Sequence, residues 1–209
     1  MKTDIIFDLD GTLIESSAGI LAAFESAFSV CGKIPTRALT SAIVGPPLME
    51  TLSDLTGTDD PAVLQPLAAA FKAHYDTAGY RLTTVFPGIV EMLSDLRERG
   101  FKLYIATNKR SLPTHLIVQH LGWADVFAGV YALDSFQPPL TSKAHMLGEV
   151  LGRCGLDPQH SLYVGDRNED GEAARSNHIP FLLAVWGYAE AHDGRWEILP
   201  SPEDLLKRL

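Results

Sequence analysis

The sequence predicts an α/β fold in which a parallel sheet is wrapped by helices and interrupted by an all-helical insertion. Short apolar runs of strand character alternate with segments of helical period along residues 82–209, and another such run stands at residues 5–7. Residues 16–81 show helical periodicity only. Because strand–helix alternation is typical of parallel sheets, we expect one core from residues 1–15 and 82–209, and an inserted unit from residues 16–81.

The elements of the core follow from this alternation. Glycines that end amphipathic segments, at Gly100, Gly122 and Gly155, mark the ends of helices. The expected strands are residues 5–7, 101–106, 126–133, 161–165 and 180–185, and the expected helices are 89–99, 112–121, 143–154, 169–177 and 202–209.

The insertion is expected to hold some four helices. Ser16 and Ser17 can cap the first, and Thr36 can cap a short second one. The turn Gly45-Pro46-Pro47 precedes a third, and Asp59-Asp60-Pro61 begins the fourth, since proline is well tolerated in the first turn of a helix.

Composition excludes several classes of function. The net charge of −9 argues against a nucleic-acid-binding protein, which would carry a basic stripe. No segment approaches the roughly 18 apolar residues of a membrane span, and Asp4 and Asp8 interrupt the first apolar stretch, so we expect no signal peptide, no membrane partner and a cytoplasmic location. Cys31 and Cys154 are isolated, which suggests neither a disulfide framework nor a zinc site. We expect a monomer or dimer.

Two carboxylates directly follow the strand at residues 5–7. Strand spacing places Asp8 and Asp10 on the same side, and Gly11 lets the chain turn sharply after them. Ligands of open α/β sheets bind at this end of the strands. Two close negative charges are costly unless a cation or a shared proton relieves them. The alternative is an acidic loop without a role.

Three further polar clusters lie downstream. Thr107 and Asn108 follow the strand at 101–106 and can donate hydrogen bonds to phosphate, although both also suit a turn. Lys143 begins a helix, where a lysine is usually solvated. Asp166 and Asp170 follow the strand at 161–165, where acids also suit the helix dipole.

In this order the motifs resemble those of the haloacid dehalogenase superfamily, most of whose members are Mg²⁺-dependent phosphatases. The matching segments are F-D-x-D-G-T-L at 7–13, A-T-N-K at 106–109, Lys143, and G-D-x-x-x-D at 165–170. The resemblance covers the whole chain and points to the phosphoglycolate phosphatase-like and pyrophosphatase-like branch. It implies a Rossmann-like parallel sheet core with residues 16–81 as an all-helical cap domain.

The resemblance also implies roles for these residues. Asp8 would be the nucleophile that becomes phosphorylated, Asp10 the general acid and then the base, and Lys143 the cation that neutralises both nucleophile and phosphoryl group. Phosphate would be bound by Thr107, Asn108 and Gly11. Mg²⁺ would be bound by Asp8, the Asp10 carbonyl, Asp166 and, through water, Asp170, with Glu169 as a possible substitute.

The expected reaction is hydrolysis of a small phosphorylated metabolite. Phosphoglycolate, pyrophosphate and a nucleoside monophosphate all stay open as substrates. Asp10 argues against a dehalogenase, and Ile20 stands where sugar phosphomutases of the superfamily carry a histidine. A phospho-receiver domain would place its acids differently, and a silent scaffold has no support in the sequence.

The sequence leaves two roles open for a turn of the insertion and two for Arg167, and it predicts one for Lys109. The turn Gly45-Pro46-Pro47 either contacts substrate or only joins two helices. Arg167 reaches either substrate or solvent. Lys109 is expected to be a solvated residue at the start of a helix.

Overall fold

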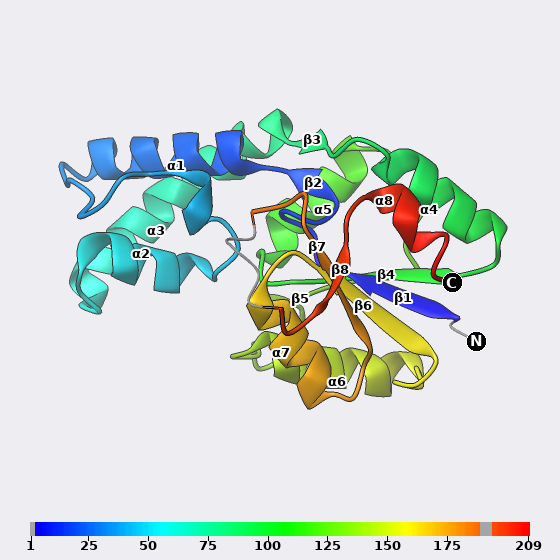
Figure 1. The fold of residues 1–209 in the computed structure, drawn as a ribbon. Coiled ribbons are helices and arrows are strands. Elements are labelled where there is room, and N and C mark those ends of the chain that lie inside the picture. The colour runs from blue at the N-terminus through cyan, green and yellow to red at the C-terminus, as the bar shows by residue number, and fades with distance from the viewer. Residues whose placement is uncertain (1–2, 189–193) are drawn as a thin grey trace.

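The computed structural model describes residues 3–188 and 194–209, and it confirms the α/β fold with a parallel sheet and a helical insertion (Figure 1). Residues 1–2 and 189–193 of the expected core lie outside the described residues. The strands of the described sheet are all parallel, in the order β5-β4-β1-β6-β7-β8. Their bounds are β1 (Asp4–Phe7), β4 (Lys102–Thr107), β5 (Gly129–Ala132), β6 (Ser161–Gly165), β7 (Phe181–Ala184) and β8 (Glu197–Leu199).

Strand β1 lies in the middle of the sheet because its apolar residues are buried on both faces. Phe7 lies opposite Ile105 of β4 and Val164 of β6, and all three side chains are almost fully buried. The carboxyl ends of these three strands therefore meet at one edge, and the polar residues that follow them are brought together there.

Helices cover both faces of the sheet. Successive residues of a strand point to opposite faces, so Ile5 and Phe7 pack with α4, α5 and α8, whereas Ile6 packs with α6 and α7. The helix bounds are α4 (Ile89–Glu98), α5 (Ser111–His120), α6 (Lys143–Cys154), α7 (Asn168–Ser176) and α8 (Pro202–Leu205).

The insertion forms a smaller lobe (Figure 1), which has a hydrophobic cluster of its own. The chain leaves the core through β2 (Ile14–Glu15) and returns through β3 (Thr84–Val85), which pair antiparallel. Between them lie α1 (Ser17–Val30), η1 (Ser41–Ile43), α2 (Leu48–Thr56), α3 (Pro61–Tyr75) and η2 (Gly79–Leu82). We call this lobe the cap; its boundaries at residues 16 and 81 stay a prediction.

Several expected elements were wrong in detail. No helix begins at Thr36, whose backbone N–H instead donates to the Leu55 carbonyl, so the described cap holds three α-helices and two 3-10 turns. Strand β8 was not predicted, because only one of its three residues is buried. The strand expected at 126–133 is confined to β5 and continues as a 3-10 turn, η3 (Leu133–Ser135), and the last helix ends at Leu205.

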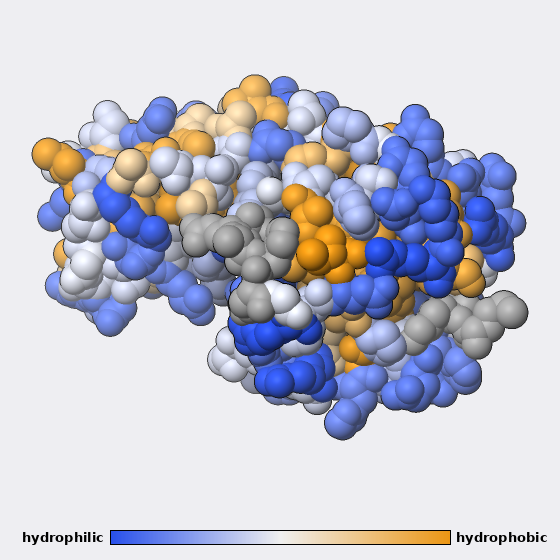
Figure 2. All heavy atoms as spheres, viewed as in Figure 1, coloured by the Kyte–Doolittle hydropathy of each residue, from blue (hydrophilic) through white to orange (hydrophobic). Residues whose placement is uncertain are grey.

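Hydrophilic side chains cover much of both lobes on the face shown in Figure 2, where one hydrophobic patch lies near the centre and others lie along the upper edge and at the end of the cap. Among the described helices none is long and apolar enough to cross a membrane.

Candidate active site

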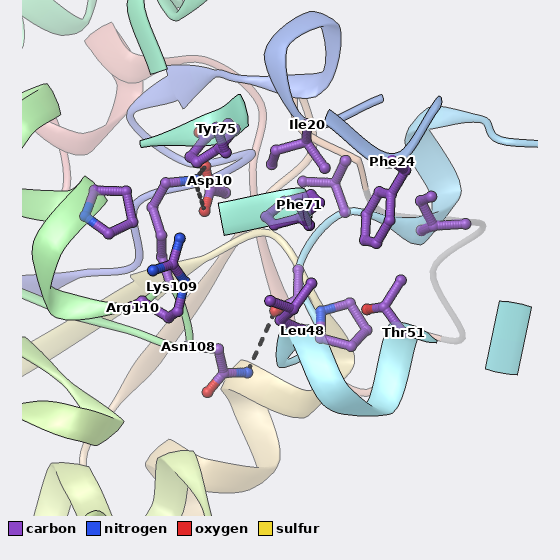
Figure 3. Close-up of a pocket in the computed structure, with 15 residues that line it drawn as sticks. Asp10, Ile20, Phe24, Leu48, Thr51, Phe71, Tyr75, Asn108, Lys109 and Arg110 are labelled. Carbon is purple, nitrogen blue, oxygen red and sulfur yellow. Dashed lines mark hydrogen bonds and ion pairs between the residues drawn. The ribbon is translucent and has the colours of Figure 1, made fainter. Parts of the chain in front are cut away.

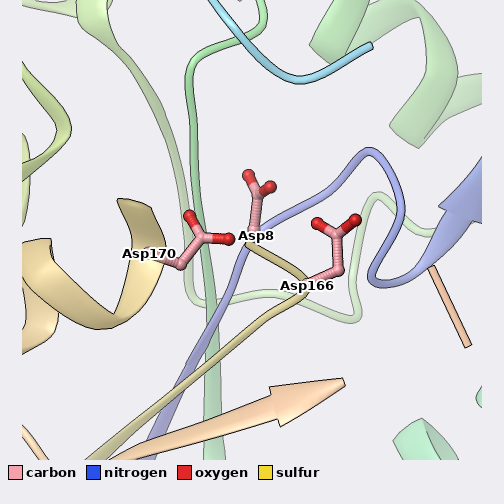
Figure 4. A group of neighbouring side chains, drawn as sticks. All are labelled: Asp8, Asp166 and Asp170. Atoms are coloured by element: carbon pink, nitrogen blue, oxygen red, sulfur yellow. The ribbon is translucent and has the colours of Figure 1, made fainter. Parts of the chain in front are cut away.

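Three buried carboxylates meet at the carboxyl edge of the sheet (Figure 4). Asp8 follows β1, Asp166 follows β6, and Asp170 lies in the first turn of α7. One oxygen from each lies within 4.8 Å of those of the other two. Glu169, the alternative to Asp170, is exposed and its carboxylate instead accepts a hydrogen bond from Asn108.

This crowding shifts the protonation of the carboxylates. Burial, together with the charges of Asp170 and Asp10, raises the pKa of Asp8 to about 6, although Lys143 opposes the shift. Burial and the charges of Asp170 and Asp8 raise the pKa of Asp166 to about 8. The cluster is therefore unfavourable in its fully ionised form unless a further cation is present.

The donor set fits Mg²⁺. The available groups are hard carboxylate oxygens, as that ion prefers. Asp166 Oδ1 is buried and has no hydrogen-bond partner in the described structure, while its Oδ2 accepts from the backbone N–H of Tyr188 at 2.8 Å. A buried carboxylate oxygen without a donor is costly, and a bound cation would remove that cost.

Lys143 supplies positive charge from the other side of the cluster. It is the first residue of α6, whose N-terminus is capped by Ser142, and its side chain is buried. Its Nζ lies 2.5 Å from Asp170 Oδ1 and 3.2 Å from Asp8 Oδ1. Although burial opposes it, the two carboxylates raise the pKa of Lys143 well above its usual range, so the ammonium stays charged.

Asp10 turns away from this cluster and pairs with Lys109. Lys109 Nζ lies 2.9 Å from Asp10 Oδ1 and 3.0 Å from Oδ2, and the lysine side chain is only 6% exposed. The expectation of a solvated Lys109 was wrong. Ser16 was expected to cap α1, but its hydroxyl donates to Asp10 Oδ1 and makes no side-chain bond to the helix end.

The expected phosphate-binding residues lie beside these acids. Thr107, the last residue of β4, is buried, and Asn108 Oδ1 is buried without a hydrogen-bond partner in the described structure. Gly11 has φ +83°, and a Cβ there would overlap the Asp166 carboxylate. Close packing at this turn therefore requires glycine.

Arg167 joins the core to the cap. Its guanidinium donates to the carbonyl oxygens of Val44 and Ala42, and Asn108 Nδ2 lies 3.4 Å from the carbonyl of Gly45. A Cβ at Gly45, where φ is +120°, would overlap the Arg167 side chain. The Gly45-Pro46-Pro47 turn is thus held by the core, and Arg167 contacts cap backbone in this structure.

A pocket opens between the cap and the Asp10 side of the site (Figure 3). Two of the residues that line it, Tyr75 and Arg110, were not identified as site residues from the sequence. The ring of Tyr75, at the end of α3, lies 4.7 Å from Lys109 Nζ, and Arg110 forms a two-pronged ion pair with Asp76. No local signal predicts these contacts, because more than 30 residues separate the partners.

Comparison with known proteins identifies the family. A family model described as haloacid dehalogenase-like hydrolase matches residues 5–184. The chain belongs to this family, as its motifs predicted, and the fold-class prediction of a core with an inserted helical cap agrees with it.

Individual relatives carry different activities in their names. Tyrosine-protein kinase PtkA of Mycobacterium tuberculosis is 35% identical over 188 residues, which are 90% of this chain and 63% of PtkA. The chain therefore spans less than two-thirds of that relative. A phosphoglycolate phosphatase of Agrobacterium fabrum is 30% identical over 190 residues, covering 88% of this chain and 81% of the relative.

A solved structure shows the same fold along the whole chain. The haloacid dehalogenase-like family protein SP0104 from Streptococcus pneumoniae superposes with a TM-score of 0.86 at 27% identity. The match covers 99% of this chain and 98% of that one. Family and fold together place this chain among hydrolases whose relatives include phosphoglycolate phosphatases.

Proposed function

We propose that the chain is a Mg²⁺-dependent phosphatase that hydrolyses a small phosphomonoester through an aspartyl phosphate on Asp8. The observation that carries this proposal is the position of Asp8. Its carboxylate lies at the end of the central strand, 3.2 Å from the Lys143 ammonium and within the buried cluster with Asp166 and Asp170. A nucleophile that must attack an anionic ester needs such cationic surroundings.

Asp8 and Asp10 both act in each of the two half-reactions. In the first, a carboxylate oxygen of Asp8 forms a bond to phosphorus, and the bond from phosphorus to the leaving oxygen breaks with its electron pair on that oxygen. Asp10 donates a proton to it, so that a neutral alcohol departs. In the second, Asp10 takes a proton from water, which attacks phosphorus and releases phosphate and the free Asp8 carboxylate.

The remaining residues are proposed to neutralise negative charge and to position the phosphoryl group. Lys143 offsets the negative charge that accumulates between Asp8 and the phosphoryl oxygens. Thr107, Asn108 and the backbone around Gly11 are proposed to bind those oxygens. Asp8, Asp166 and Asp170 would hold Mg²⁺, with the Asp10 carbonyl as a further ligand. When bound, the ion supplies electrophilic stabilisation of the phosphoryl group.

The partner is proposed to be a small phosphorylated metabolite. Phosphoglycolate is suggested by the name of the Agrobacterium relative, while pyrophosphate and nucleoside 5′-monophosphates stay as alternatives, and a sugar phosphomutase or a silent scaffold is disfavoured. We do not propose for this chain the kinase activity that the name of PtkA gives, because the match covers only 63% of PtkA. A cytoplasmic location and a monomeric or dimeric state stay predictions.

Release of phosphate from a panel of small monoesters tests the proposal. We expect release with Mg²⁺, none with EDTA, and none from Asp8→Asn, which keeps the shape of the side chain but is no nucleophile. Mg²⁺-dependent release that survives Asp8→Asn would contradict the aspartyl-phosphate route.

A further inference from the structure

The short segment that follows β7 packs against the loop that follows β1. The indole N–H of Trp186 donates to the Thr12 carbonyl at 2.9 Å. A Cβ at Gly187 would lie 2.0 Å from the carbonyl oxygen of Gly11, so the two backbones touch there. The ring of Tyr188 also lies against Gly11, where a Cβ would come within 2.8 Å of it. This segment is therefore close enough to the site to hold parts of it in place.

Tyr188 contacts the proposed metal ligand through its backbone alone. Its N–H donates to Asp166 Oδ2 at 2.8 Å, and hydrogen bonds of this kind orient the carboxylates that bind metal ions. The phenol hydroxyl takes no part in this contact. A substitution that removes only the hydroxyl therefore leaves the contact with Asp166 intact.

The hydroxyl of Tyr188 reaches the linker by which the chain enters the cap. It donates to Glu15 Oε1 at 2.7 Å and accepts from the backbone N–H groups of Ser16 and Ser17, at 2.8 and 3.1 Å. Although burial opposes it, hydrogen bonds from Ser17 and Tyr188 lower the pKa of Glu15, so this carboxylate is ionised and is the acceptor. The single proton of the phenol is thus committed to Glu15, and its oxygen lone pairs face the two amides.

Ser16 has an unusual backbone for a residue that precedes a helix. Its φ is −123° and its ψ is 2°, and its hydroxyl makes no bond to the end of α1. Ser142, which precedes α6, has the extended backbone usual at this position, with φ −150° and ψ 151°, and its hydroxyl accepts from the His145 N–H. Because ψ sets the direction of a side chain relative to the amides that follow, the Ser16 hydroxyl turns from the helix and donates to Asp10 Oδ1.

The contacts of Tyr188 hold Ser16 in this conformation. The two amides that its hydroxyl binds lie on either side of the φ and ψ bonds of Ser16, whose side chain is fully buried. We propose that Tyr188 is a positioning residue for the reaction, which keeps the hydroxyl of Ser16 on Asp10 and so orients the general acid. The inference rests on the proposed function and deepens it, since it concerns the acid of the same site.

Removal of the hydroxyl alone tests the inference. Tyr188→Phe keeps the backbone N–H that binds Asp166, so the increase in melting temperature that Mg²⁺ gives should be retained. We expect kcat/KM to fall roughly tenfold for the alkyl monoester that the natural protein hydrolyses fastest, which is part of the roughly 10²-fold or more that a positioned acid contributes. The loss should be much smaller for p-nitrophenyl phosphate, because nitrophenolate departs with little protonation.

A double-mutant cycle shows whether Tyr188 acts through Ser16. Ser16→Ala should cause the same kind of loss, and Tyr188→Phe should lower kcat/KM little further in that background, because residues that act through one another are not additive. Tyr131→Phe is the matched control. Its hydroxyl lies 3.1 Å from the Cys154 sulfur, on the edge strand β5, and its removal should leave kcat/KM unchanged for both esters. Melting curves of all variants check folding.

The outcomes separate the inference from the function on which it rests. Equal losses on the two esters, full activity of Ser16→Ala, or effects of the two substitutions that multiply in the double variant would overturn the positioning inference alone. Loss of the Mg²⁺ response in Tyr188→Phe would do the same, since the defect would then lie in the metal site. Hydrolysis of no monoester by the natural protein with Mg²⁺ would overturn the proposed function and the inference with it.

Discussion

Lys109 holds both carboxylate oxygens of Asp10, at 2.9 and 3.0 Å, with the lysine nitrogen 4.7 Å from the centre of the Tyr75 ring. Two elements of the core and one helix of the cap therefore meet at the proposed general acid. The geometry fixes the orientation of Asp10, and Lys109 would act through Asp10 as a positioning residue.

Lys109→Met should slow the step that needs a proton from Asp10. We expect kcat for an alkyl phosphate to fall on the order of 10²-fold, the lower end of what a positioned acid contributes. The loss should be much smaller for p-nitrophenyl phosphate, because nitrophenolate departs with little protonation. Steady-state kinetics on both esters measure the difference, and an equal loss on both would contradict a role through Asp10.

Asp166→Asn should abolish the stabilisation by Mg²⁺ without unfolding the protein. The substitution removes an ionisable group from the buried cluster, where burial and neighbouring carboxylates disfavour the charged form and raise the pKa of Asp166 to about 8. Relief of about 1 kcal/mol would raise the melting temperature of the metal-free protein by roughly 2–4 °C. The increase in melting temperature that Mg²⁺ gives the natural protein should disappear.

The control for this experiment is Asp95→Asn, which removes an exposed charge from α4. It should leave both the metal-free melting temperature and the response to Mg²⁺ unchanged. A full response to Mg²⁺ in Asp166→Asn would show that the ion binds elsewhere.

Lys143→Met should destabilise the protein as well as inactivate it. The ammonium is buried between Asp8 and Asp170, and removal of one partner from a buried ion pair costs about 3–5 kcal/mol. Urea unfolding in EDTA measures the loss of unfolding free energy. Lys102→Met, an exposed lysine at the start of β4, should change that free energy little; equal effects of the two substitutions would refute a buried network.

Arg167→Ala should loosen the attachment of the cap turn. Arg167 donates to the carbonyls of Val44 and Ala42, and a hydrogen bond from a charged donor contributes about 1.5–3 kcal/mol. We expect faster hydrogen exchange of the amides at residues 41–45 and KM raised by roughly tenfold. Arg175→Ala, at an exposed position of helix α7, which Arg167 directly precedes, is the matched control, and unchanged exchange at 41–45 would contradict the contact.

The parts of the fold that local pattern determines were predictable. Helix α6 and strand β6 begin and end where expected, and helix α3 begins where expected, because Gly155, a continuous apolar run and Asp60-Pro61 are signals within the segments themselves. The helix expected to begin at Thr36 does not form, because the backbone of this segment bonds to Leu55, which is distant in the sequence. Strand β8 forms through pairing with β7, and its own residues are mostly exposed.

The residues of the site also fall into those that local sequence pattern predicts and those that it does not. Asp8, Asp166 and Asp170 could be placed together because each stands at or just after the end of a recognisable strand, and parallel strands bring their ends to one edge. The burial of Lys109 could not be predicted, because the local sequence around a lysine that follows a strand is the same whether its ammonium faces solvent or a carboxylate. Its burial depends on Tyr75 and on how the cap closes over the core.

The central claim is that Asp8 carries the phosphoryl group. Rapid acid quenching during turnover of a monoester with Mg²⁺, followed by mass spectrometry of the peptide that contains Asp8, tests it most directly. We predict a phosphorylated peptide whose label is lost on treatment with hydroxylamine, as expected of an acyl phosphate, and which is absent from Asp8→Asn. Turnover that continues in Asp8→Asn, or a phosphoryl group found on another residue, would contradict the mechanism.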